Sequence, residues 1–491
     1  MTAVAITIDN PLEPLATQPS SARLWTLITV SLATFMTYLD NNIINVAIPT
    51  IQRDLHLTES GIEWVVSSYI LVFAALLLAG GRLADLLGLR RLFMVGLGIF
   101  TFSSLLAGLS GSVDFLIAFR ALQGLGAALL TPTTLAIISA VYRDPKEQAG
   151  AVATWSAVGA LALAFGPLLG GFLSEDLSWH WIFVINVPVG LATLALSYRT
   201  VPELGARQRR RLDWAGVMSS TLALGGLTYA LIQGPQVGWG SRSVLASFAL
   251  AALAGLAFVA VERGQADPMV DLSLLRSRTF TGGVVALMLW AFGLFGIYFF
   301  TSIYLQNVLH FSAIKAGLAF VPMAVLMAAG ASMSDRVAVA VGAYWSVGLA
   351  MLLMGGGIAS VGLLGTGASF WELMPSFAVI GVGGGLTIPL TATILGVMPE
   401  DRSGVASAVF NASREVAGLL GITVIGVVLS ARRTAELRLG RSPVTAYLDG
   451  FHLAVVVAGI LVASGGLVAW LALRSTRTVA TEAGPVLQLA A

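Results

Sequence analysis

Residues 62–91 read IEWVVSSYILVFAALLLAGGRLADLLGLRR. The stretch opens with an apolar run over 62–81, which is about the length that crosses the hydrocarbon core of a bilayer as a helix. A short loop follows that carries glycine, aspartate and arginine, and Gly88 in it suits a tight turn. A second apolar run occupies 91–111. We therefore predict a membrane helix, a short loop and a second membrane helix.

The same alternation of apolar runs and short loops continues through all 491 residues. Hydrophobic residues make up 57% of the chain and charged residues 11%, whereas soluble domains carry about 25% charged residues. The apolar runs are continuous and do not alternate with period two, which excludes an outer-membrane β-barrel. The sequence predicts an all-α polytopic membrane protein with fourteen spans, at 24–48, 62–81, 91–111, 115–140, 149–173, 181–198, 214–232, 243–261, 280–304, 315–333, 340–364, 372–396, 404–430 and 452–473.

A faint internal repeat divides the chain. Gly126 and Pro132 recur 257 residues later as Gly383 and Pro389, and transporters are often built from two similar halves. The offset exceeds half the chain length, which two extra helices between the halves would explain. The predicted division is a cytoplasmic tail (1–23), a six-helix bundle (24–198), a linker with two additional membrane helices (199–262), a second six-helix bundle (263–474) and a cytoplasmic tail (475–491).

The distribution of basic residues predicts the orientation. An even number of spans puts both termini on one side of the membrane. If that side is the cytoplasm, the cytoplasmic segments hold 18 basic residues and the outer segments 7, as the positive-inside rule requires. The outer segment 431–441 departs from the rule, so we expect it to be an amphipathic segment on the outer surface, or the last two spans to be misplaced.

Several function classes are excluded by residues that the sequence lacks. Without cysteine there is no disulfide and no thiolate metal site, and no phosphate-cradling GxxxxGK[ST] loop is present for a primary pump. A membrane enzyme would need clustered His, Cys or carboxylate groups within the spans. We therefore predict no catalysis, no metal and no cofactor. The predicted partners are a small lipophilic substrate, protons and membrane lipids, without nucleic acid, and one chain holding both halves would suffice as a monomer.

Four charged residues lie deep within predicted spans: Asp40, Arg120, Arg414 and Glu415. Asp40 and Arg120 have comparable depth, so we expect them to pair, either as a structural ion pair or as a proton switch. Arg414 and Glu415 are neighbours and point about 100° apart on a helix, so we expect that they do not simply satisfy each other.

Glycine patterns indicate close helix contacts. The fifth span contains Gly159, Gly166, Pro167, Gly170 and Gly171, in which the spacing of Gly166 and Gly170 allows close approach of two helices. This is either ordinary packing or a dry seam that resists leakage between the halves.

The ninth span is rich in aromatic residues that suit a lipophilic ligand, although they could equally face lipid or pack the second half. Polar residues of the first and fourth spans could add hydrogen bonds. The candidate substrate-binding residues from these spans are Tyr38, Asn41, Asn42, Gln123, Trp290, Phe295, Tyr298 and Phe299.

Taken together, these stretches resemble the major facilitator superfamily, in its fourteen-helix drug–proton antiporter branch. The resemblance rests on five stretches and on Asn411 with Arg414 in the thirteenth span. The stretches are 39–49 (LDNNIINVAIP), 81–91 (GRLADLLGLRR), 120–126 (RALQGLG), 166–171 (GPLLGG) and 179–190 (WHWIFVINVPVG). Glu415 stands where relatives usually carry Gln.

The resemblance implies a multi-pass exporter of the bacterial inner membrane, driven by the proton-motive force. Asp40 would take up and release the proton with Arg120 modulating it, and Glu415 would be a second titratable site. Asn411 and Arg414 would join the substrate site. A latch between the halves would consist of Gly81, Asp85, Gly88, Arg90 and Arg91. An exporter or flippase of one lipid or endogenous metabolite is the alternative.

Overall fold

The computed structural model describes residues 20–203, 213–265, 268–396 and 403–474, and every regular element in these ranges is a helix. The predicted all-α class is confirmed. The first six spans form one bundle, in which the sixth span is divided between α6 and α7 and a π-helical turn (Leu173–Leu177) follows α5. The helices are α1 (Ser20–Asp54), α2 (Glu59–Leu87), α3 (Leu89–Gly108), α4 (Val113–Val141), α5 (Pro145–Phe172), α6 (Trp181–Val184) and α7 (Asn186–Thr200).

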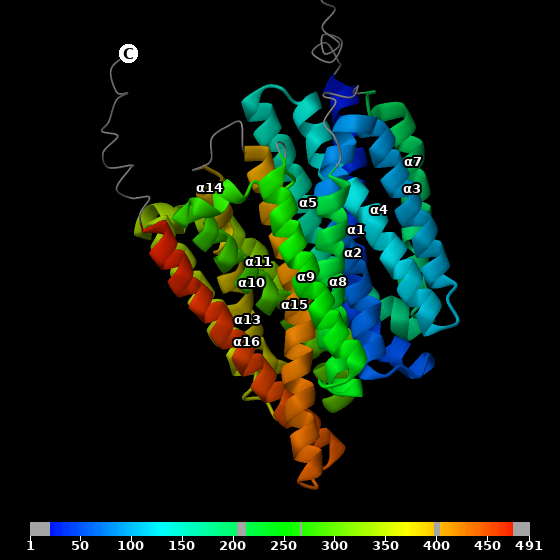
Figure 1. The fold of residues 1–491 in the computed structure, drawn as a ribbon, viewed down its shortest axis with the longest axis vertical. Helices are drawn as coiled ribbons and strands as arrows, with labels where there is room; N and C mark the ends of the chain where they lie inside the picture. Colours follow the sequence, from blue (N-terminus) through cyan, green and yellow to red (C-terminus); the bar gives the residue numbers. More distant parts are fainter. Residues whose placement is uncertain (1–19, 204–212, 266–267, 397–402, 475–491) are drawn as a thin grey trace, which may run out of the picture.

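The two additional helices form a hairpin, α8 (Trp214–Val237) and α9 (Arg242–Gly264). Asp213 and Ser241 cap their first turns, because each side chain accepts a hydrogen bond from a free backbone N–H. α8 packs on both α2 and α15, and α9 packs on α8 (Figure 1). The hairpin therefore covers one flank of the boundary between the two bundles.

The second bundle repeats the plan of the first. Its fourth span is divided between α13 and α14, and a π-helical turn (Tyr304–Val308) follows its first helix. The helices are α10 (Arg278–Ile303), α11 (Ala313–Val341), α12 (Ala343–Val361), α13 (Phe370–Gly385), α14 (Ile388–Gly396), α15 (Ser403–Arg438) and α16 (Pro443–Leu473), preceded by a 3₁₀ turn (Leu272–Arg276).

The repeated glycines occupy equivalent places in the two bundles. A Cβ added to Gly126 would lie 2.6 Å from the backbone nitrogen of Phe100, where α4 crosses α3. A Cβ added to Gly383 would lie 2.6 Å from the Ala350 carbonyl oxygen, where α13 crosses α12. In each bundle the fourth helix therefore packs closely on the third.

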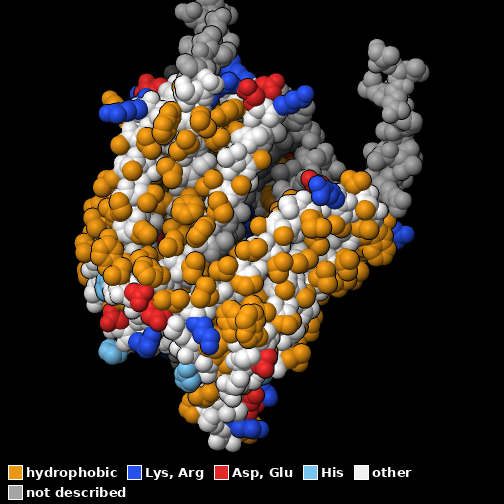
Figure 2. Space-filling model, turned by 180° about the vertical axis from the view of Figure 1, so that it is seen from behind, with side chains coloured by type: hydrophobic (Ala, Val, Ile, Leu, Met, Phe, Trp, Pro, Cys, Tyr) orange, Lys and Arg blue, Asp and Glu red, His pale blue; other side chains and the backbone are white. Residues whose placement is uncertain are grey.

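Thirteen helical segments in the described ranges are long and apolar enough to cross a membrane. α5, with 28 residues, packs against α1 and α11, and with it the predicted number of fourteen fits the fold. Figure 2 shows the apolar belt expected of such a protein, with basic and acidic side chains gathered toward the two ends. The protein is thus a multi-pass membrane protein.

The chain begins α1 and finishes α16 at the same end of the molecule, which we name the terminal end; the opposite end is the distal end (Figure 1). Segment 431–441 is mostly helical, so the predicted spans 404–430 and 452–473 are too short at their distal ends. α15 continues as a helix to Arg438 and projects with the start of α16 beyond the rest of the distal end. Its basic charge is offset locally, because Arg432 pairs with the buried Glu436 at 2.6 Å.

The two bundles meet along two pairs of helices, α5 with α11 and α2 with α15. Several polar contacts between the bundles lie toward the distal end. Gln306 donates to the carbonyl of Val46 at 2.8 Å, and Glu175 accepts from the backbone N–H of Ile314 at 2.8 Å. Toward the terminal end Figure 2 shows a hollow between the bundles. The molecule is therefore closed at its distal end and open toward its terminal end.

Candidate functional site

Asp40 and Arg120 lie in the interior of the first bundle, and neither side chain is exposed. The Arg120 Nη1 donates to Asp40 Oδ2 at 2.6 Å, so the expected pair exists. Glycine at position 124 permits this arrangement, because a Cβ there would collide with the carbonyl of Tyr69. α4 therefore approaches α2 closely enough for the Arg120 Nε to reach the carbonyl of Val65 at 3.3 Å.

The Asp40 carboxylate accepts hydrogen bonds from three side chains. Its Oδ1 accepts from Gln123 Nε2 at 2.7 Å and from Asn186 Nδ2 at 3.0 Å, in addition to the bond from Arg120 to Oδ2. Ser104 accepts from the same two amide groups at 3.2 and 3.0 Å. Both oxygens of Asp40 therefore act as hydrogen-bond acceptors.

Arg120 keeps one unsatisfied donor. Its Nη2 is buried and has no hydrogen-bond partner, whereas its guanidinium lies 4.4 Å from the ring centroid of Tyr69 and 5.8 Å from that of Phe183. Aromatic faces attract a desolvated cation. The guanidinium is thus held by the Asp40 carboxylate, by Gln123 Oε1 at 2.8 Å, by the Val65 carbonyl and by two rings, and it has a donor available for a second arrangement.

A cavity lies between the two bundles, on the other side of Tyr69 from this network; we name it the central cavity. Tyr69 lines the cavity, whereas Asp40 and Arg120 do not. The remaining lining comes from α1, α2, α4, α10 and α15. It includes eight predicted site residues, namely Tyr38, Asn41, Asn42, Trp290, Phe295, Tyr298, Arg414 and Glu415, together with Thr37, Asn45, Val66, Ile70, Phe73, Thr131, Leu294 and Ile422.

The expectation for Arg414 and Glu415 was wrong. Arg414 donates from Nε and Nη2 to Glu415 Oε1, at 3.1 and 2.7 Å. Their Cβ atoms diverge, but the three-carbon stem and the fork of the guanidinium let Arg414 fold back along the helix to its neighbour. Glu415 Oε2 is nonetheless buried without a partner, and the side chain of Arg414 remains 25% exposed.

Three predicted substrate-binding residues lie away from the lining of the central cavity. Gln123 is bound to Asp40 and Ser104 inside the first bundle. Phe299 lines a different pocket, near the distal end. Asn411 lies one turn before Glu415 on α15 and is half-buried.

The predicted seam residues lie where α5 contacts two helices. A Cβ on Gly166 would lie 2.7 Å from that of Asn42, and one on Gly170 would collide with the carbonyl of Ile43, so both face α1. Gly171 faces the second bundle, since its added Cβ would lie 2.5 Å from the Ala313 carbonyl. Pro167 also contacts the second bundle. Its carbonyl oxygen lies so close to Gly317 of α11 that a Cβ on Gly317 would collide with it. Gly159 has only Thr34 nearby, at 3.8 Å.

The predicted latch residues lie at the terminal end of the first bundle. Gly88 has φ 88° and joins α2 to α3, a conformation that glycine adopts without strain. Arg90 donates to the carbonyl of Tyr198 on α7, and Arg91 is exposed. Gly81 is half-buried near Pro132. The Asp85 side chain lies outside the described part of the structure.

Sequence reasoning missed Tyr69, Ser104 and Asn186 as members of the site. Asn186 falls within 179–190, and a polar residue in an otherwise apolar helix was an available signal. Tyr69 gave none, because a tyrosine in a membrane helix is equally compatible with a lipid-facing position. Within the described ranges, no group of three or more His, Cys, Asp or Glu residues could hold a metal ion.

Comparison with known proteins identifies the family. The family described as Major Facilitator Superfamily matches residues 30–422. The chain is 34% identical over 418 residues to multidrug resistance protein Stp of Mycobacterium tuberculosis, covering 84% of this chain and 77% of that protein. It is 33% identical to puromycin resistance protein pur8 of Streptomyces alboniger, covering 96% of each. The tetracenomycin C resistance and export protein of Streptomyces glaucescens is 33% identical, with 87% of this chain and 80% of that protein covered.

Solved structures show the same fold. A bacterial homologue of the human lysosomal transporter Spinster superposes with a TM-score of 0.67, covering 94% of this chain and 99% of the other. At 17% identity this likeness concerns the fold alone.

Proposed function

This chain belongs to the major facilitator superfamily, and on that premise we propose that it exports small lipophilic compounds, antibiotics among them, in exchange for protons. One observation carries the proposal: a buried carboxylate, Asp40, is paired with Arg120 and lies behind Tyr69 next to a cavity between two bundles. Relatives named for multidrug, puromycin and tetracenomycin C resistance favour a drug over a lipid or metabolite as substrate.

Asp40 is proposed to carry the transported proton. In its present arrangement the carboxylate accepts from Arg120, Gln123 and Asn186. A proton on Asp40 Oδ2 would weaken the hydrogen bond from Arg120. It would also neutralise the carboxylate and so remove the Coulomb attraction that holds α1 to α4. Because Arg120 has a spare donor and two aromatic neighbours, its guanidinium could remain buried after the pair separates. Proton binding thereby becomes a change in how tightly α1 is held to α4.

The central cavity is proposed to bind the substrate. Trp290, Phe295 and Tyr298 offer apolar and aromatic surface, while Glu415 Oε2 and the Trp290 indole N–H are buried polar atoms without partners. A buried unpaired polar atom costs about 1–3 kcal/mol, which a ligand with a complementary group would recover. The site therefore suits a lipophilic molecule that carries a hydrogen-bond donor or one positive charge.

The orientation is proposed from the basic residues, with the terminal end and both termini in the cytoplasm. The closed distal end then makes the present state open to the cytoplasm, which agrees with an ionised Asp40 that has released its proton inward. When the halves rock to the opposite state, Gly81, Asp85, Gly88, Arg90 and Arg91 would latch the cytoplasmic side. The same proposal includes the division of the chain at 24–198, 199–262 and 263–474 and a monomeric state. It also takes the proton-motive force as the source of free energy, with no cofactor.

Inverted membrane vesicles test this function. A proton gradient is imposed, a lipophilic fluorescent compound or puromycin is added, and uptake and proton release are compared between wild type and Asp40→Asn. We expect substrate-induced proton release in wild type and at least a tenfold loss in the variant. Gradient-driven uptake that persists in Asp40→Asn would move coupling to another residue, with Glu415→Gln as the next variant. No flux in folded wild-type protein with any compound would contradict drug–proton exchange.

A further inference from the structure

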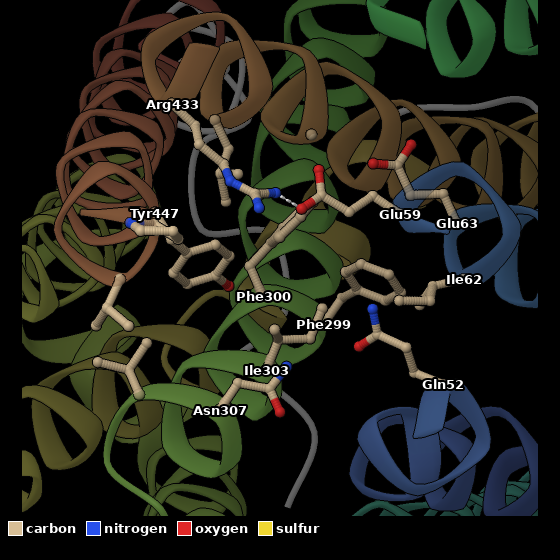
Figure 3. Close-up of a pocket in the computed structure, with 15 residues that line it drawn as sticks. Gln52, Glu59, Ile62, Glu63, Phe299, Phe300, Ile303, Asn307, Arg433 and Tyr447 are labelled. Atoms are coloured by element: carbon tan, nitrogen blue, oxygen red, sulfur yellow. Dashed lines mark ion pairs between the residues drawn. The ribbon is translucent and has the colours of Figure 1, made fainter. Parts of the chain in front are cut away.

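A second pocket lies between the bundles near the distal end, separate from the central cavity; we name it the distal pocket. Its volume is about 240 Å³, and α2, α10, α15 and α16 supply most of its lining (Figure 3). Two carboxylic acids, Glu59 and Glu63, stand one turn apart on α2 and both line it. Phe299, Phe300 and Ile303 make much of the remaining wall apolar.

The two acids have different surroundings. Glu59 pairs with Arg433 of α15, so it forms an ion pair across the boundary between the bundles. Figure 3 shows the Glu63 carboxyl beside α15, apart from the ion pair that joins Arg433 to Glu59. It lies flat against Gly426, where an added Cβ would be 3.0 Å from Glu63 Cδ and still closer to Oε1. Only glycine at 426 leaves room for this contact.

Among its described residues, the pocket offers no free positive charge to pair with an ionised Glu63. The other titratable groups that line the pocket in the described structure are Glu59 on the same helix, Arg433 on α15 and Tyr447 on α16. On the helices packed against α2, Tyr229 of α8 contacts Trp64, and Arg120 of α4 is bound to the Val65 carbonyl and to Asp40. α1 and the turn after α10 contribute the neutral amides Gln52 and Asn307. Arg433 is the one basic residue among the described residues that line the pocket, and it is already bound to Glu59. An ionised Glu63 would therefore add a second negative charge one turn from Glu59, in a position that repels it.

Closure of the distal end is what produces this environment. α2 and α15 belong to different bundles, so separation of the bundles would take Gly426 away from Glu63 and let water surround the carboxyl group. Water favours the ionised form, whereas contact with Gly426 and aromatic side chains favours the neutral form. The free energy of closing the distal end thus depends on whether Glu63 holds a proton.

We propose that Glu63 is a second proton-binding site, filled from the distal side, and that its protonation favours closure of α2 against α15. This proposal rests on the function proposed above, since it assumes a cycle in which the distal end opens and closes. A proton taken up and released on the same side is not transported. Glu63 would therefore make the cycle respond to external pH without changing the number of protons exchanged per substrate.

The chain contains no cysteine, so the distal gap can be measured directly. Leu109 and Leu363 are 69% and 85% exposed on distal loops of opposite bundles, and Leu109→Cys with Leu363→Cys would carry a pair of spin labels. Distances in lipid nanodiscs from pH 5 to pH 8.5 would give the fraction of closed molecules. The measurement is made in the Asp40→Asn background so that the central network does not contribute to the pH response.

We expect the closed fraction of the Glu63 protein to rise as the pH falls. Glu63→Gln should stay mostly closed at every pH. At pH 8.5 its ratio of open to closed molecules should be about tenfold lower than that of the Glu63 protein, which corresponds to a difference of one pKa unit between the open and closed states. Glu63→Asp should keep the pH response. Glu59→Gln should act in the opposite direction, because it frees Arg433 and weakens closure. An unchanged pH response in Glu63→Gln would overturn the proposal.

A transport assay separates this proposal from the proposed function. With Asp40 intact, Glu63→Gln should retain the proton-to-substrate ratio of wild type while its rate loses its dependence on external pH. Loss of the ratio itself would overturn the assignment of Glu63 to a regulatory proton. Failure of Asp40→Asn to uncouple transport would contradict the proposed function and leave the Glu63 result standing.

Discussion

In the described part of the chain each bundle contains an arginine paired with a carboxylate within its spans, and the two pairs differ in their burial and in their partners. Asp40 and Arg120 come from different helices, are fully buried, and are surrounded by Gln123, Asn186 and Ser104. Arg414 and Glu415 are neighbours on one helix and face the central cavity, with Glu415 Oε2 unpartnered. A closed pair between helices can move those helices when it titrates. An open pair, by which we mean one that lies on a single helix and lines the central cavity, is better placed to bind a substrate in that cavity.

The largest difference between the pairs should appear when each arginine is removed. Arg120→Gln leaves Asp40 buried without a cation, which costs about 3–5 kcal/mol in comparable sites. Arg414→Gln removes a partly exposed cation from a carboxylate that lines the central cavity, so we expect a smaller loss of about 1–3 kcal/mol. Thermal unfolding in detergent measures both. Equal losses would remove the distinction between a closed pair and an open pair.

A double variant sharpens this result. Asp40→Asn with Arg120→Gln removes both charges and should recover most of the stability lost in Arg120→Gln. Proton-coupled transport should not recover, because no titrating group remains in the network. If transport returns with stability, the Asp40–Arg120 pair is structural.

Glu415→Gln should alter substrate choice without abolishing coupling. The amide keeps a hydrogen-bond acceptor toward the cavity and loses the negative charge. We expect affinity for a monocationic lipophilic compound to fall about tenfold, with little change for a neutral compound of the same size, which is about 1.4 kcal/mol of charge-assisted hydrogen bonding. Binding measured by tryptophan fluorescence with a matched cationic and neutral pair checks this. A loss of proton release with neutral substrates would instead place Glu415 among the proton carriers.

A smaller effect is expected at the wall between the two sites. Tyr69→Phe keeps the ring that lies 4.4 Å from the Arg120 guanidinium and should behave like wild type. Tyr69→Ala removes the ring and opens the network to the central cavity, so protons should leak without substrate at a rate a few times that of wild type. Dissipation of a pH gradient in proteoliposomes measures the leak. If Tyr69→Ala is as tight as Tyr69→Phe, the ring does not separate the two sites.

The fold was predictable from the sequence because hydropathy alone determines which segments can leave water, and the described helices match the predicted spans. The Asp40–Arg120 pair was predictable from depth, since two buried charges at one level have few other partners. Arg414 and Glu415 were mispredicted because the angle between Cβ atoms ignores the reach of long side chains. Gln123 is three residues from Arg120 and shares its helix face, so its place beside Asp40 was available from periodicity. Glu63 gave no signal, because an acid near the end of a span looks like an interfacial residue.

The contact between α5 and α11 is made largely by backbone against backbone, through Gly171 and Gly317. Such a contact fills space and has few strong bonds to break when the bundles separate at the distal end. The two end states can then differ by only a small free energy, so that a modest ligand preference is enough to shift the population from one to the other. The contact also matters for the membrane potential. Close packing of α5 on α11 resists the passage of ions between the bundles, and it does so with few strong bonds that would hinder their movement.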